Sequence, residues 1–207
     1  MATKKTATKA KPAALPDGAV HFETRAEWRA WLAAHHARDA GVWLVSWRKA
    51  AGKPAMTYDE MVEEALCVGW VDSKPSKLDE ARTMLWFAPR KAGSAWSRPN
   101  KERIARLEAA GLMRPAGAAK VAQAQRDGTW TKLDAVEDLV VPDDLRAAFR
   151  RHAGAAANFE AFPRSAKRGI LEWIVQAKKA ETRAGRIEET ARLAAKGERA
   201  NQWRPKA

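Results

Sequence analysis

The stretch that decides the fold is Leu66–Asn100, LCVGWVDSKPSKLDEARTMLWFAPRKAGSAWSRPN. It bends often, with glycine or proline at Gly69, Pro75, Pro89, Gly93 and Pro99. Between the bends, residues 70–73 and 83–88 have the composition of strands, and the second ends at its proline because proline lacks the donor that a strand ladder needs. Tryptophans beside charged residues in so bent a segment are typical of a functional surface. The stretch therefore predicts a small antiparallel sheet whose loops form a binding site.

Two helices and one strand are predicted in the residues before this stretch. Thr24 and Thr57 are each followed three positions later by a glutamate, the capping-box pattern that opens a helix. We therefore expect helices over 24–38 and 57–68. The apolar run 42–47 between them predicts a strand.

The rest of the chain is predicted to be mostly helical. Ser97 is a suitable N-cap, and Pro115 and Pro142 suit the start of a helix, where their missing N–H groups leave no hydrogen bond unmade. The expected helices cover 97–111, 115–128, a segment that starts at 142, and 164–197 with a break near 182–185. The predicted fold class is α+β, with a small antiparallel sheet packed with helices and followed by a C-terminal helical segment.

Composition divides the chain into two structured parts with a tail at each end. Residues 1–17, rich in lysine and alanine, predict a disordered tail because they hold too little large apolar surface to offset the entropy of ordering. The polar stretch 131–141 predicts a domain boundary. The expected organisation is a tail over 1–17, an α+β domain over 18–131, a helical domain over 142–197 and a loose tail over 198–207.

The charge of the chain favours anionic partners. Its 38 lysines and arginines exceed its 25 aspartates and glutamates, which gives a formal net charge of +13. Such a charge attracts nucleic acids, acidic proteins or anionic small molecules. A merely solvated basic surface is the alternative that charge alone leaves open.

Cysteine and hydropathy patterns indicate the compartment. Cys67 is the single cysteine, so it makes no internal disulfide, and its place on the apolar side of a helix predicts an inert core thiol. The lysines of the N-terminus are followed by no apolar run of the secretory type, and no segment approaches the roughly 20 apolar residues of a membrane span. We therefore expect a cytoplasmic protein without a transmembrane segment.

The candidate site consists of polar, cationic and aromatic residues in or just after the quoted stretch. Asp72 and Arg90 together are suited to binding a polar or anionic ligand, and a structural ion pair that ties the sheet to the loop is the competing interpretation. Trp96, set among small residues in a loop, is expected to be exposed, whereas Trp86 is expected in the core. The candidate ligand-binding residues are Trp70, Asp72, Arg90, Ser94, Trp96, Asn100, Lys101 and Arg103. No metal ligands and no cofactor are expected, and no catalytic residue is identified.

The same segment has the composition of a nucleic-acid surface, in which cations neutralise phosphates and rings stack on bases. Trp86 and Trp96 would supply the rings. The cations that would contact phosphates are Arg82, Arg90, Lys91, Arg98, Lys101, Arg103 and Arg106. Burial of both rings in the core is the competing interpretation.

Several short motifs within residues 20–197 carry a family resemblance. They include Gly41-Val-Trp-Leu, Thr57-Tyr-Asp-Glu, Gly69-Trp-Val-Asp, Pro89-Arg, Ser94-Ala-Trp-Ser, Gly128-Thr-Trp and Trp173-Ile. In this combination the chain resembles the YdeI/OmpD-associated family, also labelled bacteriocin-protection proteins. The resemblance implies a link to protection from bacteriocins or antimicrobial peptides and to an outer-membrane porin. It implies no known reaction, and therefore no catalytic residue.

Together these observations predict a non-enzymatic cytoplasmic protein that acts in stress or antimicrobial protection. It would bind an anionic partner through the Trp, Arg and Asp loop surface. The alternatives are a small-molecule-binding enzyme with Asp72 and Arg90 in its site, a nucleic-acid-binding protein, and a helical interaction module within 142–197.

Overall fold

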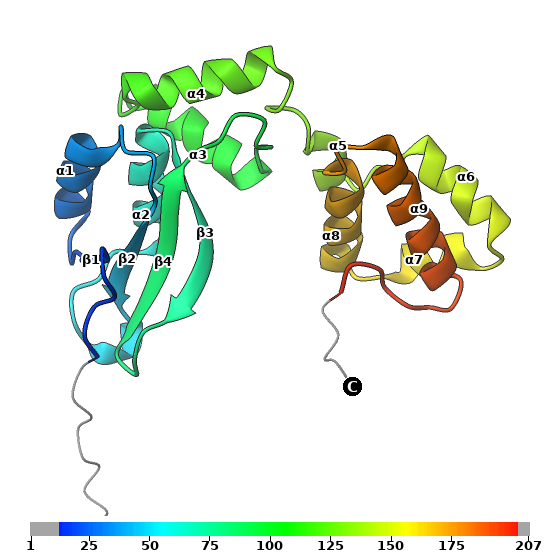
Figure 1. Cartoon of the computed structure of the whole chain (residues 1–207), viewed down its shortest axis with the longest axis horizontal. Helices are drawn as coiled ribbons and strands as arrows, with labels where there is room; N and C mark the ends of the chain where they lie inside the picture. Colours follow the sequence, from blue (N-terminus) through cyan, green and yellow to red (C-terminus); the bar gives the residue numbers. More distant parts are fainter. Residues whose placement is uncertain (1–12, 203–207) are drawn as a thin grey trace, which may run out of the picture. The chain divides into compact units, whose positions relative to one another are not determined.

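The computed structural model describes residues 13–202, which form two compact units (Figure 1). The first unit comprises the described residues up to 94 together with 102–123, and the second comprises 95–101 and the residues from 124 onward. The predicted tails fall largely on 1–12 and 203–207, which lie outside the described residues. At the start of the described chain, the backbone N–H of Ala13 donates to Asp79 Oδ2 at 3.3 Å.

The first unit contains the mixed sheet and the helices that pack on it. Its elements are β1 (Val20–His21), α1 (Arg25–His35), β2 (Val42–Trp47), the 3-10 helix η1 (Lys49–Ala51), α2 (Tyr58–Cys67), β3 (Trp70–Lys77) and β4 (Arg82–Pro89). Two further helices, α3 (Arg98–Ala109) and α4 (Pro115–Arg126), have residues in both units. Complete capping boxes at Thr24 and Thr57 start α1 and α2, which confirms both predicted helix starts.

Across the described residues the sheet has four strands in the order β1-β2-β4-β3. β2 pairs antiparallel with β4, and β4 antiparallel with β3, as the sequence predicts. β1 pairs in parallel with β2, so the sheet is mixed rather than purely antiparallel. The fold class α+β is confirmed. In β3 the register shifts between Asp72 and Pro75, a bulge that interrupts the ladder beside the candidate carboxylate.

One face of the sheet is covered by α1. The indole of Trp28, fully buried, lies 5.3 Å from the ring of Phe87 in β4, and its Nε1 donates to the carbonyl oxygen of Met61 in α2 at 3.0 Å. Because side chains alternate along a strand, Trp86 belongs to the opposite face. There its ring meets that of Trp43 edge-on at 5.2 Å, and both rings are half-buried. The prediction that Trp86 is a core residue is therefore only half right.

The second unit is helical and has its own apolar core. Its helices are α5 (Asp134–Glu137), α6 (Asp143–Arg151), α7 (Ala155–Ala161), α8 (Arg164–Val175) and α9 (Ala180–Ala194). Leu145, Phe159 and Ile174 are almost completely buried and belong to a continuous hydrophobic cluster. Burial of this kind, more than helix propensity, stabilises short helices.

The structure corrects the prediction of a helix break near 182–185. α9 runs through these residues without interruption, and the chain breaks instead between α8 and α9 at residues 176–179. Gly185 suggested the break, but a single glycine in a helix costs only about 1 kcal/mol relative to alanine, which tertiary packing overrides. The stretch 131–141 contains α5 and contributes Leu133 and Val136 to the core of the second unit.

Over residues 13–202, every helix is too short or too polar to cross a bilayer.

Candidate functional site

The predicted site residue Asp72 lies beside the β3 bulge and accepts a hydrogen bond from Tyr58, a residue outside the predicted set of ligand-binding residues. The hydroxyl of Tyr58, at the start of α2, donates to Asp72 Oδ2 at 2.8 Å. Tyr58 is the only tyrosine of the chain and is 51% exposed. Desolvation and the hydrogen bond to Asp72 raise the pKa of Tyr58 to about 12. At neutral pH the Tyr58 hydroxyl therefore stays protonated and donates to Asp72.

Arg90 and Trp70 lie at the same end of β3 and β4 as Asp72, but both are buried. Arg90 is 5% exposed, and burial lowers its pKa to about 10, against the opposing effect of the Asp72 charge. The indole of Trp70 is 1% exposed and its Nε1 donates to the His36 carbonyl oxygen at 3.0 Å. The structure thus brings these three predicted residues together, with only Asp72 partly accessible.

Arg103 joins this cluster through Tyr58. Its guanidinium carbon lies 5.6 Å from the centre of the Tyr58 ring, and its Nε donates to Asp59 Oδ1 at 3.2 Å. Ser94 is half-buried and lies in a turn, where its backbone N–H donates to the Lys91 carbonyl oxygen. We call Tyr58, Asp59, Asp72, Arg90 and Arg103 the Tyr58 cluster.

The other predicted residues belong to the second unit. Trp96 is 1% exposed and its ring lies 5.0 Å from that of Trp130, so the prediction that it is exposed is wrong. The small residues around Trp96 indicated a loop, but they gave no sign of the distant ring on which it packs. Lys101 forms an ion pair with Asp134 at 2.5 Å, and Asn100 is half-buried in the first turn of α3.

Most cations of the predicted nucleic-acid segment are paired inside the fold. Arg90 is buried, and of the others only Lys91 is both fully exposed and outside the ion pairs of the described residues. The pairs are Arg82–Asp79, Arg98–Asp138, Lys101–Asp134, Arg103–Asp59 and Arg106–Glu63. Carboxylates from neighbouring elements thus neutralise the charges that this interpretation assigned to phosphates. The buried Trp96 likewise offers no ring for stacking.

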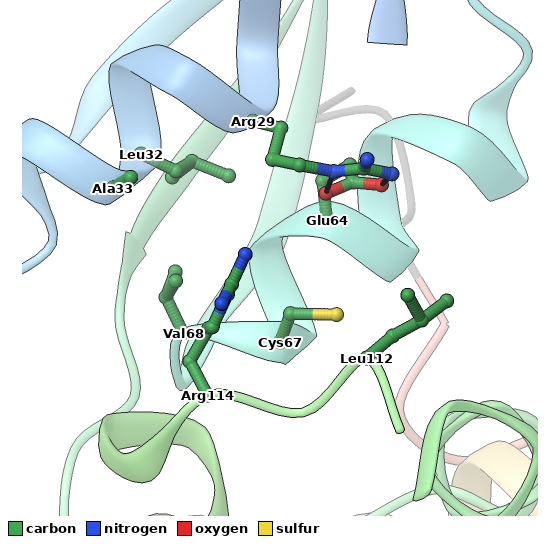
Figure 2. A pocket seen from close by; sticks show the side chains of 8 residues that line it. All are labelled: Arg29, Leu32, Ala33, Glu64, Cys67, Val68, Leu112 and Arg114. Atoms are coloured by element: carbon green, nitrogen blue, oxygen red, sulfur yellow. Dashed lines mark hydrogen bonds and ion pairs between the residues drawn. The ribbon is translucent and has the colours of Figure 1, made fainter. Parts of the chain in front are cut away.

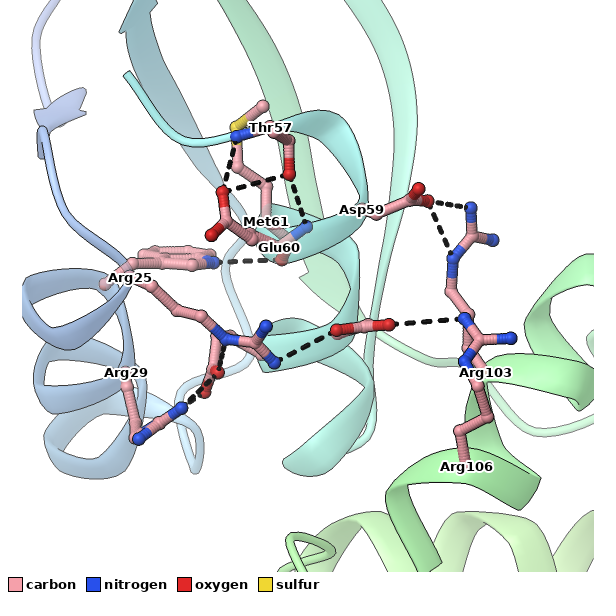
Figure 3. A network of polar contacts seen from close by, with 11 residues as sticks. Arg25, Arg29, Thr57, Asp59, Glu60, Met61, Arg103 and Arg106 are labelled. Atoms are coloured by element: carbon pink, nitrogen blue, oxygen red, sulfur yellow. Dashed lines mark hydrogen bonds and ion pairs between the residues drawn. The ribbon is translucent and has the colours of Figure 1, made fainter. Parts of the chain in front are cut away.

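Two carboxylates of α2 link three helices of the first unit (Figure 3). Glu64 is buried and accepts hydrogen bonds from Arg29 at 2.7 and 2.8 Å and from Arg25, both on α1. Glu63 pairs with Arg25 at 3.0 Å and with Arg106 of α3 at 3.3 Å. The alternating charges therefore position α1 and α3 on either side of α2.

This network predicts an acid-sensitive fold. Burial alone would raise the pKa of Glu64, but the hydrogen bonds from Arg29 and Arg25 hold it below its ordinary 4.5. A lowered folded-state pKa gives stability that is present above 4.5 and is lost as the pH falls through the folded-state value. We expect the free energy of unfolding to fall on acidification and Glu64→Gln to lower it by about 2–3 kcal/mol at neutral pH, since its partners are partly exposed.

Urea denaturation at a series of pH values checks this expectation. Glu80→Gln is the matched control, because Glu80 is 84% exposed and solvent screens its ion pair with Lys77, so its loss should leave the stability almost unchanged. If the free energies of unfolding of the wild type and Glu64→Gln change in parallel as the pH falls through the acid range, the role assigned to Glu64 is contradicted.

A small pocket near the end of α2 contains the single cysteine. Figure 2 shows the side chains of Cys67 and Arg114 at this pocket, with the Arg29–Glu64 pair on its rim. Its volume is about 40 Å³, enough for a few water molecules but not for a metabolite. Cys67 is buried, as predicted for a core thiol, and this burial raises its pKa to about 11.

A larger groove lies where β2 runs into η1, beside the start of α2 and the edge strand β3. Its volume is about 580 Å³, within the range of roughly 300–1,000 Å³ that is usual for small-molecule sites. The residues that line this η1 groove are Ser46, Trp47, Arg48, Lys49, Met56, Met61, Pro75, Ser76, Lys77 and Thr83. Every charged residue among them is basic. No local pattern in the sequence indicated this groove, because its lining comes from segments that are distant in the chain, from Ser46 to Thr83.

Comparison with known proteins assigns the two parts of the chain to different family models. Residues 20–120 match a model described as "Domain of unknown function (DUF8412)". Residues 138–197 match the model "Bacteriocin-protection, YdeI or OmpD-Associated". The resemblance predicted over 20–197 is thus confirmed for 138–197, whereas most of the quoted motifs lie in the part that matches the other model. A search of curated proteins found no match, and neither did a search of solved structures.

Proposed function

We propose that this protein protects a cell against bacteriocins or related antimicrobial stress, because residues 138–197 match the model described as "Bacteriocin-protection, YdeI or OmpD-Associated". It does so in the cytoplasm, by binding an anionic partner and without catalysis. The η1 groove, in the part of the chain that matches the other family model, is the binding surface.

The observation that carries this proposal is the charge of the groove. Arg48, Lys49 and Lys77 line it, and no carboxylate does. Lys77 pairs with Glu80, but Arg48 and Lys49 are exposed and lie beyond ion-pair distance of every carboxylate in the part of the chain that the structure describes. These cations therefore remain available to a partner, unlike the paired cations of the predicted nucleic-acid segment.

The properties of two potential catalytic groups support binding over catalysis. Acid–base catalysis near neutral pH uses groups whose pKa lies close to the working pH. Tyr58 and Cys67 have pKa values raised to about 12 and about 11, so both stay protonated. The hydroxyl of Tyr58 instead donates to the carboxylate of Asp72 at 2.8 Å.

A survival assay tests the proposal. Susceptible bacterial cells that express the wild-type protein are expected to survive a bacteriocin challenge better than cells without it. The double variant Arg48→Ala/Lys49→Ala should lose most of this advantage, because it removes the two exposed cations of the groove.

Lys91→Ala/Arg126→Ala is the matched control, since it removes the same charge from exposed positions that do not line the groove. It should protect as well as the wild type. Equal protection by the groove variant, expressed at the same level, would refute the proposed role of the groove.

A further inference from the structure

The floor of the η1 groove is apolar and held in place. Met56 and Met61 line it and are 6% and 8% exposed. The carbonyl oxygen of Met61 accepts the hydrogen bond of the buried Trp28 indole, so α2 cannot shift without breaking a core contact. Thioether side chains adapt to ligands of varied shape because they are flexible and polarisable. The floor therefore suits a hydrocarbon chain or ring.

The cationic end of the groove is held in place by the backbone. The N–H of Arg48 donates to the Ala81 carbonyl oxygen at 2.8 Å, which ties the end of β2 to the start of β4. Lys49 then begins η1, which Gly52 ends in the left-handed conformation with φ of 63°. A guanidinium beside an ammonium group binds an oxyanion well, since the guanidinium can donate two parallel hydrogen bonds.

We propose that the η1 groove binds an amphiphilic monoanion, a molecule with an apolar body and one carboxylate headgroup. The apolar body lies on Met56 and Met61, and the carboxylate binds Arg48 and Lys49. This inference rests on the proposed function, because it specifies the ligand class of the same anion-binding groove.

Two features favour such a ligand over a polyanion. Glu80, which pairs with Lys77 and acts electrostatically on Arg48, lowers the net positive charge at this end of the groove. The Met56 and Met61 floor has no polar group to offer a phosphate chain, and a polyanion would leave its apolar surface in contact with water. A ligand with a single anionic headgroup and an apolar body matches both the cationic end of the groove and its apolar floor.

Calorimetric titration of the full-length protein with decanoate tests the proposal. We expect one decanoate per chain, with acetate and 1-decanol each bound at least about tenfold more weakly. Acetate lacks the apolar body, and 1-decanol lacks the carboxylate. Equal binding of all three, or no binding of decanoate, would overturn the inference.

Variants separate the two halves of the site. Arg48→Ala/Lys49→Ala should weaken decanoate binding about tenfold or more, because hydrogen bonds between ions are strong. Ser76→Trp should abolish binding without changing a charge, since it places a ring in the groove from the edge strand β3. Lys91→Ala/Arg126→Ala should bind like the wild type. Unchanged binding by both groove variants would overturn the inference.

The outcome also distinguishes this inference from the proposed function. If decanoate does not bind but a single-stranded oligonucleotide does, in a manner lost in Arg48→Ala/Lys49→Ala, the inference fails and binding of an anionic partner stands. If decanoate binds as expected but the double variant still protects cells, the inference stands and the protective role of the groove fails.

Discussion

Replacing Gly117 by alanine is expected to lower the free energy of unfolding by about 3 kcal/mol or more. Gly117 lies in α4, and a Cβ atom there would meet the carbonyl oxygen of Cys67 at 2.2 Å and that of Leu66 at 2.8 Å. Both contacts are with the backbone at the end of α2, which cannot rotate away as a side chain can. α4 would have to separate from α2, and urea denaturation followed by circular dichroism would record the loss.

Gly185→Ala is the matched control for this effect. Gly185 lies within α9, and a Cβ atom there would have nothing within 4 Å. Because alanine is the better helix former, this substitution should raise stability by roughly 0.5–1 kcal/mol. The same glycine-to-alanine change is thus expected to lower the free energy of unfolding at position 117 and to raise it at position 185. A Gly117→Ala variant as stable as the wild type would show that α4 does not pack on α2 as described.

Trp96→Ala is expected to be strongly destabilising, although the sequence predicts an exposed side chain at this position. Truncation of a buried tryptophan removes about 3–5 kcal/mol, and Trp96 is 1% exposed beside Trp130. Thermal and urea unfolding should both shift to milder conditions.

Decanoate binding by the folded fraction of the Trp96→Ala variant should be unchanged, because Trp96 does not line the groove. Trp43→Ala, at a half-buried ring, provides the comparison and should cost less. A stable Trp96→Ala variant would restore the original interpretation of Trp96 as an exposed ligand contact.

Those parts of the fold that depend on local chemistry were predictable from the sequence. The capping boxes at Thr24 and Thr57 involve residues three positions apart, so their pattern is visible in the chain. β2 and β4 follow from short apolar runs bounded by turn residues, but only the first half of β3, residues 70–73, was predicted, because its second half is polar and contains Pro75. β1, with two residues, was not predicted, because only its parallel pairing with β2 makes it a strand.

The candidate site was less predictable because it depends on contacts between distant residues. Asp72 and Arg90 were correctly chosen as neighbours, but Tyr58 reaches Asp72 from 14 positions earlier in the chain. Arg98 and Asp138 pair across 40 positions, a neutralisation that no local pattern reveals. Composition therefore located the cations correctly, but it could not show which of them already form ion pairs within the fold.

The paired indoles of this chain provide optical probes for each unit. Trp43 and Trp86 lie 5.2 Å apart on the sheet of the first unit, and Trp96 and Trp130 lie 5.0 Å apart in the second. Indoles this close share their electronic excitation, so each pair should give a coupled near-ultraviolet dichroism signal that disappears when its rings separate. Mutating one ring of either pair would separate its signal from that of Trp28 and Trp31, which stack at 5.3 Å in the first unit. The melting of the two units could then be followed separately, without an attached dye.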